Sequence, residues 1–486
     1  GSIVRGSLLF QPRQDLEILL RAEWYQNEGD PTTVRGVAPG LAANSQPFQD
    51  GYRTPANFFA AAPNDRGYND SDVYMAVLEA NWDVGGGTLT FINGIREIRE
   101  RGFTDYDGLP GTYFHTRGDY NQNQSSSELR YAMQLNDRIG FTLGAYYFES
   151  QWISGQNREL SRSTQFLATE SRQEQDSFAF FAEGDWNITD RLTLTLGARY
   201  TEETKTAATA PFGSCNFDIT NCVYGAPDSV SDDDVTPRVA LAYELSDNHL
   251  LYGSVTRGFR SGGFALRGVP LISPYASEQV TAYEIGSKND FFDNRLRVNV
   301  AGYVNNFTDL QRTTVATDPV AGIVQSTFNA AEATIQGLEV EVDAHVTNNL
   351  LLQLSYGYID ATYDSFLGVA NVTSRAFVRV PENTLGVSAE YSQPLSNDAE
   401  LAARLSAYYT DSFFYDDANT LQQDAYTLID ASVGYTAPGG DWSVTLWGKN
   451  LTEEEYAHWG ANLGALGENY FIGRPRTWGV QLSREF

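Results

Sequence analysis

The chain is dominated by short segments in which apolar and polar residues alternate. Between residues 295 and 305, Leu296, Val298 and Val300 occupy every second position, with Arg297 and Asn299 between them. Side chains alternate across a β-strand, so such a segment presents one apolar and one polar face. The same alternation occurs at residues 192–200 and 338–345. Its repetition along the chain predicts an all-β protein, a transmembrane antiparallel β-barrel with lipid outside and water inside.

Composition separates a barrel from other membrane folds. The hydrophobic content is 42%, the mean hydropathy is -0.36, and the chain lacks the run of about 18 apolar residues that a membrane-spanning helix needs. Aromatic residues make up 13% of the chain, which fits girdles at the two membrane–water interfaces. A large soluble β-sandwich or propeller would also alternate, but it has no need for so many aromatic residues at strand ends.

Connections of two kinds follow one another along the chain. Short connections rich in Gly, Asn, Asp or Pro, which favour tight turns, fall at residues 11–14, 84–87, 136–138, 187–190, 246–248, 290–294, 347–349, 394–398 and 437–440. Long polar stretches lie between them, at 26–70, 104–121, 151–174, 204–232, 262–277, 312–325, 364–374, 412–424 and 451–470. This order predicts about 19 strands, with short turns in the periplasm and long loops outside the cell.

The net charge limits which partners the chain can bind, and the two cysteines indicate the compartment in which it folds. The formal net charge of -29 argues against nucleic acid, whose binding proteins neutralise phosphates with Lys and Arg. The two cysteines, Cys215 and Cys222, lie close together in one predicted loop. We predict that they form a disulfide. Closing so short a loop lowers the entropy of the unfolded chain and raises the free energy of unfolding by about 2–3 kcal/mol, and the bond persists only in an oxidising compartment. A metal site is the alternative, but the four histidines are scattered, so we predict no metal site.

The last segment alternates in the same way, with Trp478, Val480 and Leu482 on one face and Gly479 and Gln481 on the other. The chain ends at Phe486, which we expect the barrel-assembly machinery to recognise. Arg484 falls on the apolar face, but near the membrane rim its guanidinium can reach the headgroups.

Several motifs, taken in order, resemble those of the TonB-dependent outer-membrane receptors. They are LLYGS at 250–254, RGFRSGGF at 257–264, YEIGSK at 283–288, NAA at 329–331, QGLE at 336–339, NLT at 450–452 and GRPR at 473–476. The resemblance covers the whole chain. It implies a siderophore-receptor-like protein in the outer membrane of a Gram-negative cell.

The family barrel has about 22 strands, and its wide lumen is filled by an N-terminal plug. Neither a plug nor a TonB-contacting segment is recognisable in this sequence. We therefore expect residues 1–486 to be a transmembrane barrel portion, roughly strands 4 to 22 of the family pattern, with the plug and first strands not present in this chain.

The resemblance implies active uptake of a large scarce nutrient, driven by TonB and its inner-membrane motor proteins through the plug. We expect the external ligand to be a ferric siderophore, with cobalamin, haem or an oligosaccharide as alternatives within the family. A passive porin-like channel is the alternative from another class. We expect no enzyme activity, since no serine lies in a nucleophile motif with a plausible histidine partner. No cofactor and no catalytic residue are predicted; the other expected partner is outer-membrane lipid.

Ligand-binding candidates are aromatic and cationic residues expected to face the outer vestibule. Such side chains suit anionic iron complexes through hydrogen bonds and stacking. Each could equally belong to an aromatic girdle or to a structural ion pair. The candidates are Trp152, Arg257, Arg260, Phe264, Arg267, Tyr415, His458 and Trp459.

Overall fold

The computed structural model describes residues 1–37, 46–61, 63–160, 166–210, 222–266, 273–318, 322–366, 375–463 and 467–485. Nearly all of its regular structure is strand, and the described residues include one four-residue α-helix, α1 (Gln46–Gln49), and a 3-10 turn, η4 (Pro438–Gly440). A search of the described residues for a helix able to cross a membrane found none.

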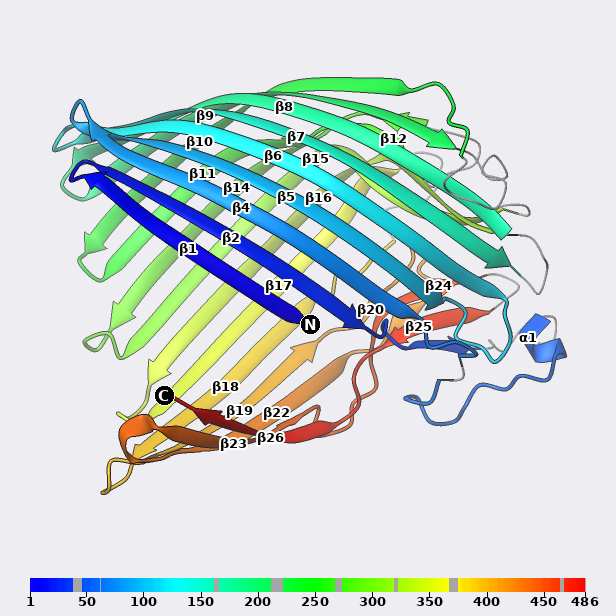
Figure 1. Ribbon diagram of the computed structural model, residues 1–486. Coiled ribbons are helices and arrows are strands. Elements are labelled where there is room, and N and C mark those ends of the chain that lie inside the picture. The colour runs from blue at the N-terminus through cyan, green and yellow to red at the C-terminus, as the bar shows by residue number, and fades with distance from the viewer. Residues whose placement is uncertain are drawn as a thin grey trace.

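Nineteen strands form one antiparallel sheet that curls around a central space (Figure 1). Each strand pairs with the next main strand along the chain. In order they are β1 (Ser2–Arg13), β2 (Leu16–Gly29), β4 (Tyr68–Val84), β5 (Gly87–Asp105), β6 (Phe114–Asn136), β7 (Ile139–Leu160), β8 (Phe166–Thr189), β9 (Leu192–Ala210), β10 (Asp228–Ser246), β11 (His249–Arg260), β14 (Glu278–Phe291), β15 (Leu296–Asp318), β16 (Gly322–His345), β17 (Leu350–Phe366), β18 (Asn383–Pro394), β19 (Glu400–Thr410), β22 (Tyr426–Thr436), β23 (Trp442–Lys449) and β26 (Thr477–Arg484). The all-β prediction and the strand number are confirmed.

The two end strands of the sheet do not meet. Within the described residues, β1 pairs with β2 alone and β26 pairs with β23 alone. Figure 1 shows these two edges facing one another across an opening, with the two chain ends beside it.

Alternation places an apolar face on the outside of the curled sheet, as predicted. Val298 and Val300 of β15 lie opposite Val342 and Val340 of β16. Large apolar side chains on this outer face are exposed, and Ile285 reaches 72%. The other face carries charged pairs such as Arg238 with Glu183, whose Nη1 and Oε2 lie 3.3 Å apart. An outward apolar face and an inward polar face are what a transmembrane barrel requires.

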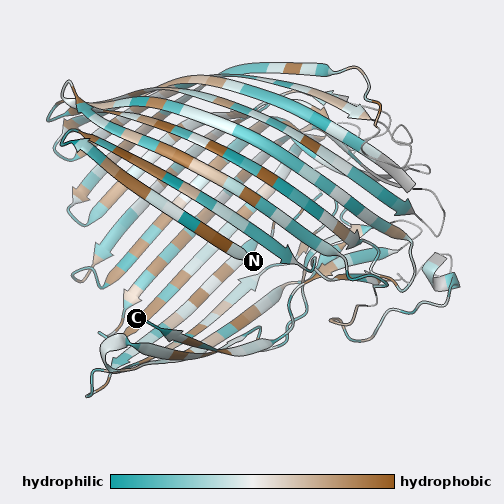
Figure 2. Ribbon diagram, viewed as in Figure 1, coloured by the Kyte–Doolittle hydropathy of each residue, from teal (hydrophilic) through white to brown (hydrophobic). Residues whose placement is uncertain are grey.

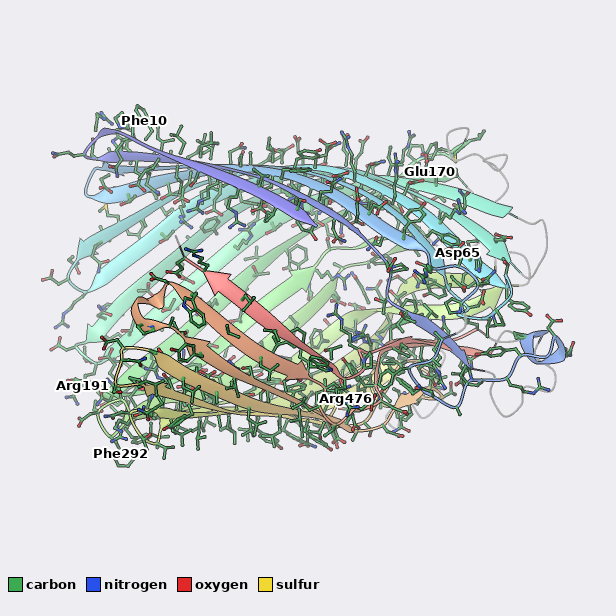
Figure 3. The ribbon with its side chains drawn as sticks, turned by 60° about the horizontal axis from the view of Figure 1, so that its bottom comes forward. Phe10, Asp65, Glu170, Arg191, Phe292 and Arg476 are labelled. Carbon is green, nitrogen blue, oxygen red and sulfur yellow. The ribbon has the colours of Figure 1, made fainter. Side chains whose placement is uncertain are left out.

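The nine short connections are turns, as predicted. Arg191 and Phe292 lie at this turn end of the sheet, whereas Asp65 and Glu170 lie at the opposite end, which we call the loop end (Figure 3). Figure 2 shows hydrophilic residues predominating along the strands towards the loop end.

Several of the connections predicted as long polar loops are partly strand. Much of 151–174 and 104–121 is strand, since β7 extends to Leu160, β8 begins at Phe166 and β6 begins at Phe114. These parts of the strands carry mostly polar side chains, among them Gln151, Gln156 and Glu174. The hydrogen bonds between neighbouring strands nevertheless continue through these residues, so their polarity did not indicate a loop.

Short strands complete the loop end. β3 (Val34–Val37), β25 (Glu468–Ile472) and β24 (Ala457–Asn462) form a small sheet, and β12 (Gly263–Ala265) pairs with β13 (Ser273–Tyr275). β20 (Phe413–Phe414) pairs with β21 (Gln422–Gln423).

Candidate functional site at the loop end

Segments far apart in sequence join at the loop end. β3, between β2 and β4, pairs with β25, between β23 and β26, so that Gly36 lies opposite Asn469. β25 in turn pairs with β24. We call the sheet of β3, β25 and β24 the loop sheet. It joins the segment between β2 and β4, near one edge of the main sheet, to the segment between β23 and β26, at the other edge.

Four aromatic rings pack around the loop sheet, and we call them the mouth quartet: Tyr106, Phe114, Trp459 and Phe471. The ring centroid of Tyr106 lies 5.2 Å from that of Phe114, 5.8 Å from that of Trp459 and 5.5 Å from that of Phe471. All three contacts are edge-to-face, an arrangement worth about 0.5–1.5 kcal/mol per pair beyond burial. Tyr106 is thus the ring that the other three share.

A second aromatic group lies beside the quartet. Tyr415 is buried, and its hydroxyl donates to the carbonyl oxygen of Ala457 over 2.7 Å, with Oε1 of Gln423 as a second acceptor of the same proton at 3.1 Å. Burial raises the pKa of Tyr415, so the hydroxyl keeps its proton. His458 contacts Tyr456 edge-to-face, and Tyr456 stacks on Tyr426.

The loop from β5 to β6 contains a buried group of titratable residues, which we call the triad: Asp105, Asp107 and His115. Their carboxylate and ring-nitrogen atoms all lie within 4.8 Å of one another, and each residue is at most 5% exposed. Such atoms can bind metals, but here the carboxylate oxygens already accept backbone N–H groups. Asp107 accepts from Leu109, Tyr113 and Phe114 over 2.5–3.1 Å, and Asp105 accepts from Asn64 and Gly108 over 2.9–3.0 Å. The two carboxylates therefore hold the backbone of this loop in place through hydrogen bonds.

The electrostatics of the triad favour bound protons. Burial, followed by the charge of Asp105, raises the pKa of Asp107 to about 7, although the backbone hydrogen bonds act in the opposite direction. Burial alone would lower the pKa of His115, but the hydrogen bond to Asp105 and the charges of Asp105, Asp107 and Glu159 raise it overall.

The described residues among the predicted site residues lie in three separate places: around the loop sheet, on β7, and on β11 and β12. Tyr415, His458 and Trp459 come together around the loop sheet. Trp152 lies elsewhere, on β7, with its ring centroid 6.1 Å from that of Tyr120 on β6. Arg267, Cys215 and Phe486 lie outside the described residues, so the disulfide with Cys222 and the terminal assembly signal remain predictions.

The predicted arginines form ion pairs within the sheet. Arg257 Nη2 lies 3.3 Å from Asp234 Oδ2, which also accepts from Gln279. Arg260 Nη1 lies 3.9 Å from Glu278 Oε1. Phe264 is 6% exposed on β12, where it lies opposite Pro274. A role of these residues in ligand binding stays a prediction.

Sequence reasoning missed Asp105, Asp107 and Tyr106. A faint signal existed in two aspartates two residues apart just before a Gly–Leu–Pro–Gly turn, because such carboxylates often cap turn amides. No sequence motif near His115 indicated that it would contact these aspartates, because the contact forms only where the start of β6 pairs with the end of β5.

Comparison with known proteins agrees with this architecture. The family model described as "TonB dependent receptor-like, beta-barrel" matches residues 13–451. The pesticin receptor of Yersinia pestis is 21% identical over 94% of this chain and 68% of its own length. The ferrioxamine B receptor of Salmonella typhimurium is 23% identical over 70% of this chain and 45% of its own length.

Solved structures resemble the fold over the whole chain. The ferric yersiniabactin uptake receptor from Yersinia pestis superimposes with a TM-score of 0.79 and 18% identity, covering 100% of this chain and 70% of the receptor. The unliganded ferric citrate transporter gives a TM-score of 0.71 with 18% identity, 100% of this chain and 70% of that transporter. The family is one of transport receptors rather than enzymes. This chain belongs to the TonB-dependent receptor β-barrel family and is a Gram-negative outer-membrane protein.

Proposed function

We propose that this protein imports a ferric siderophore across the outer membrane in a TonB-dependent manner. The observation that carries the proposal is the family match over residues 13–451, together with relatives named for siderophore uptake, among them the ferrioxamine B receptor and the ferrichrome transporter of Escherichia coli. The loop end, with its aromatic and polar side chains, would meet the ligand from outside the cell. No catalytic step is proposed.

The partners follow from the same proposal. TonB would act through a plug, and residues 1–486 would supply strands of the surrounding barrel. Outer-membrane lipid would cover the apolar outer face, and the barrel-assembly machinery would insert the chain.

Uptake of radioactive iron tests the proposal. Cells lacking their own siderophore receptors and producing this receptor should accumulate iron-55 from at least one of ferrichrome, ferrioxamine B, ferric yersiniabactin or ferric citrate. Labelled cyanocobalamin, haemin and maltooligosaccharide serve as comparison ligands. Accumulation of one of these, with no siderophore transported, would contradict the proposal.

A further inference from the structure

Two segments of the loop end meet at a pair of tyrosines, Tyr415 and Tyr470. Tyr470 lies on β25, where its Cα partner on β3 is Arg35. Tyr415 follows β20, and its ring centroid lies 6.2 Å from that of Tyr470. Figure 1 shows β20, β24 and β25 together at the loop end. The tyrosine pair therefore joins the loop sheet to the connection between β19 and β22.

One arginine lies beside each of the two tyrosines. Arg35 is opposite Tyr470, and Arg379, in the connection between β17 and β18, donates its amide nitrogen to the carbonyl oxygen of Phe414 over 2.8 Å, next to Tyr415. Burial raises the pKa of both tyrosines, and the positive charge of Arg379 opposes this shift at Tyr415 as that of Arg35 does at Tyr470. Both guanidinium groups are thus close enough to act on the pair.

Arg35 has no counter-charge among the described residues. Its Nη2 donates to the carbonyl oxygen of Pro55 over 2.9 Å, and its guanidinium carbon lies 5.2 Å from the ring centroid of Phe58. Its Nε is buried and has no hydrogen-bond acceptor. No carboxylate oxygen of the described residues lies within 4.0 Å of its guanidinium nitrogens. A partly buried cation without a counter-charge is unfavourable by itself, so this position suits an anion supplied from outside.

Arg379 is exposed, and its side chain makes no hydrogen bond or ion pair in the part of the chain that the structure describes. Its backbone is nevertheless fixed, since its φ is 60° and the preceding residue, Val378, forms a β-bridge with Phe414. A positive φ is uncommon for residues other than glycine, and glycine would adopt it at lower cost. The local fold therefore does not explain an arginine here, and its guanidinium is free to contact a ligand.

The carboxylates of the neighbouring segments do not neutralise these two arginines. Asp416 accepts backbone amides of the turn that follows it, Asp417 forms an ion pair with an arginine of β15, and Glu468 accepts a tyrosine hydroxyl over 3.1 Å. Glu382, three residues after Arg379, lies more than 4.0 Å from either guanidinium. Both cations are therefore available to an anionic group that is not part of the described chain.

We propose that Arg35 and Arg379 form an anion subsite at the loop end, which binds a negatively charged group of the ligand and makes the receptor prefer anionic ferric complexes. The planar guanidinium group suits carboxylate and catecholate oxygens. In a chain with a formal net charge of -29, an anion is repelled from most of the surface, so two unpaired cations favour this place over others. The identity of the ligand as a ferric complex rests on the proposed function, whereas the anion subsite itself does not.

Equilibrium binding to outer membranes that contain the receptor tests the subsite. The probes are iron-55 complexes of different charge: ferric citrate and a ferric tris-catecholate, which are anionic, ferrichrome, which is neutral, and ferrioxamine B, which is positively charged. An anionic complex should bind the unaltered receptor, and Arg35→Gln and Arg379→Gln should each weaken that binding about tenfold, the usual effect of losing one charged hydrogen bond. Arg379→Lys keeps the charge and should bind nearly as the unaltered receptor does. Arg191→Gln, the same change at the turn end, should leave binding within about twofold because it removes a charge far from the subsite (Figure 3).

Arg379→Gln keeps the test decisive if Arg35→Gln does not fold, because the Arg379 side chain has no partner among the described residues to lose. Failure of both anionic complexes to bind, or unchanged binding in Arg379→Gln, would overturn the inference. An equal loss for ferrichrome or ferrioxamine B would also overturn it, because the defect would then not concern charge. Transport of a neutral or cationic siderophore alone would refute the subsite and leave the proposed function standing. Arginine-dependent binding of ferric citrate to a receptor that transports no ferric siderophore would refute the proposed function and leave the subsite standing.

Discussion

At the scale of single residues, two side chains fix the geometry of the loop end: Tyr106 contacts the three other rings of the mouth quartet, and Asp107 accepts three backbone amides. Tyr415, His458 and Trp459 were expected at the loop end because they lie in polar connections, and the structure brings them together around β24; their contact with a ligand stays a prediction. Asp107 was not predictable, because its role depends on the amides of Leu109, Tyr113 and Phe114 and on a histidine that reaches it only when β6 pairs with β5. The order of residues along the chain does not show a contact of this kind.

The contact between Gly36 and the β5–β6 loop gives a prediction at the same scale. Gly36→Ala places a methyl group against the Asp107 carbonyl and should destabilise the loop sheet by about 1–3 kcal/mol, the usual cost of overpacking. Gly29→Ala is the matched control, because the nearest atom to its Cβ is 3.9 Å away. Hydrogen–deuterium exchange of residues 34–37 and 468–472 measures the effect. Equal exchange in both variants would show that the close approach does not limit packing.

At the scale of elements, turn chemistry was predictable and loop length was not. The turn at residues 290–294 is an example, since Phe292, Asp293 and Asn294 all adopt positive φ and Asp290 pairs with Arg297 over 2.8 Å. Asn and Asp tolerate this conformation, so the composition of the turn was informative. By contrast, β7 and β8 stay paired as far as Glu159 and Phe166, through residues whose polarity had suggested a loop. Polarity reports exposure to water, not the absence of a strand.

The two faces of β9 give the prediction at this scale. Leu196 is 52% exposed on the outer face, and Leu196→Arg should cost about 2–4 kcal/mol of folding free energy in lipid. Thr195 faces the other way, where its hydroxyl donates to Asp185 over 2.6 Å, and Thr195→Arg should cost much less because the interior is polar. Urea unfolding in lipid vesicles compares the two. Similar losses for both variants would contradict the assignment of the faces.

At the scale of the whole molecule, the curled sheet and the loop sheet form one assembly. The main sheet has two edges, β1 and β26, which are not paired with each other in the part of the chain that the structure describes. The pairing of β3 with β25 joins the connections beside those edges at the loop end. The count of strands followed from the order of turns and loops, but this joining could not, because it links residues more than four hundred positions apart along the sequence.

The dependence of transport on TonB tests the central claim most directly. Iron-55 uptake from the transported siderophore is measured in two strains that produce this receptor, one with TonB and one without it, at equal receptor levels in the outer membrane. The account predicts that uptake is lost without TonB while the ligand still binds to the cell surface. Uptake that continues unchanged without TonB would contradict it and would identify the protein as a passive channel.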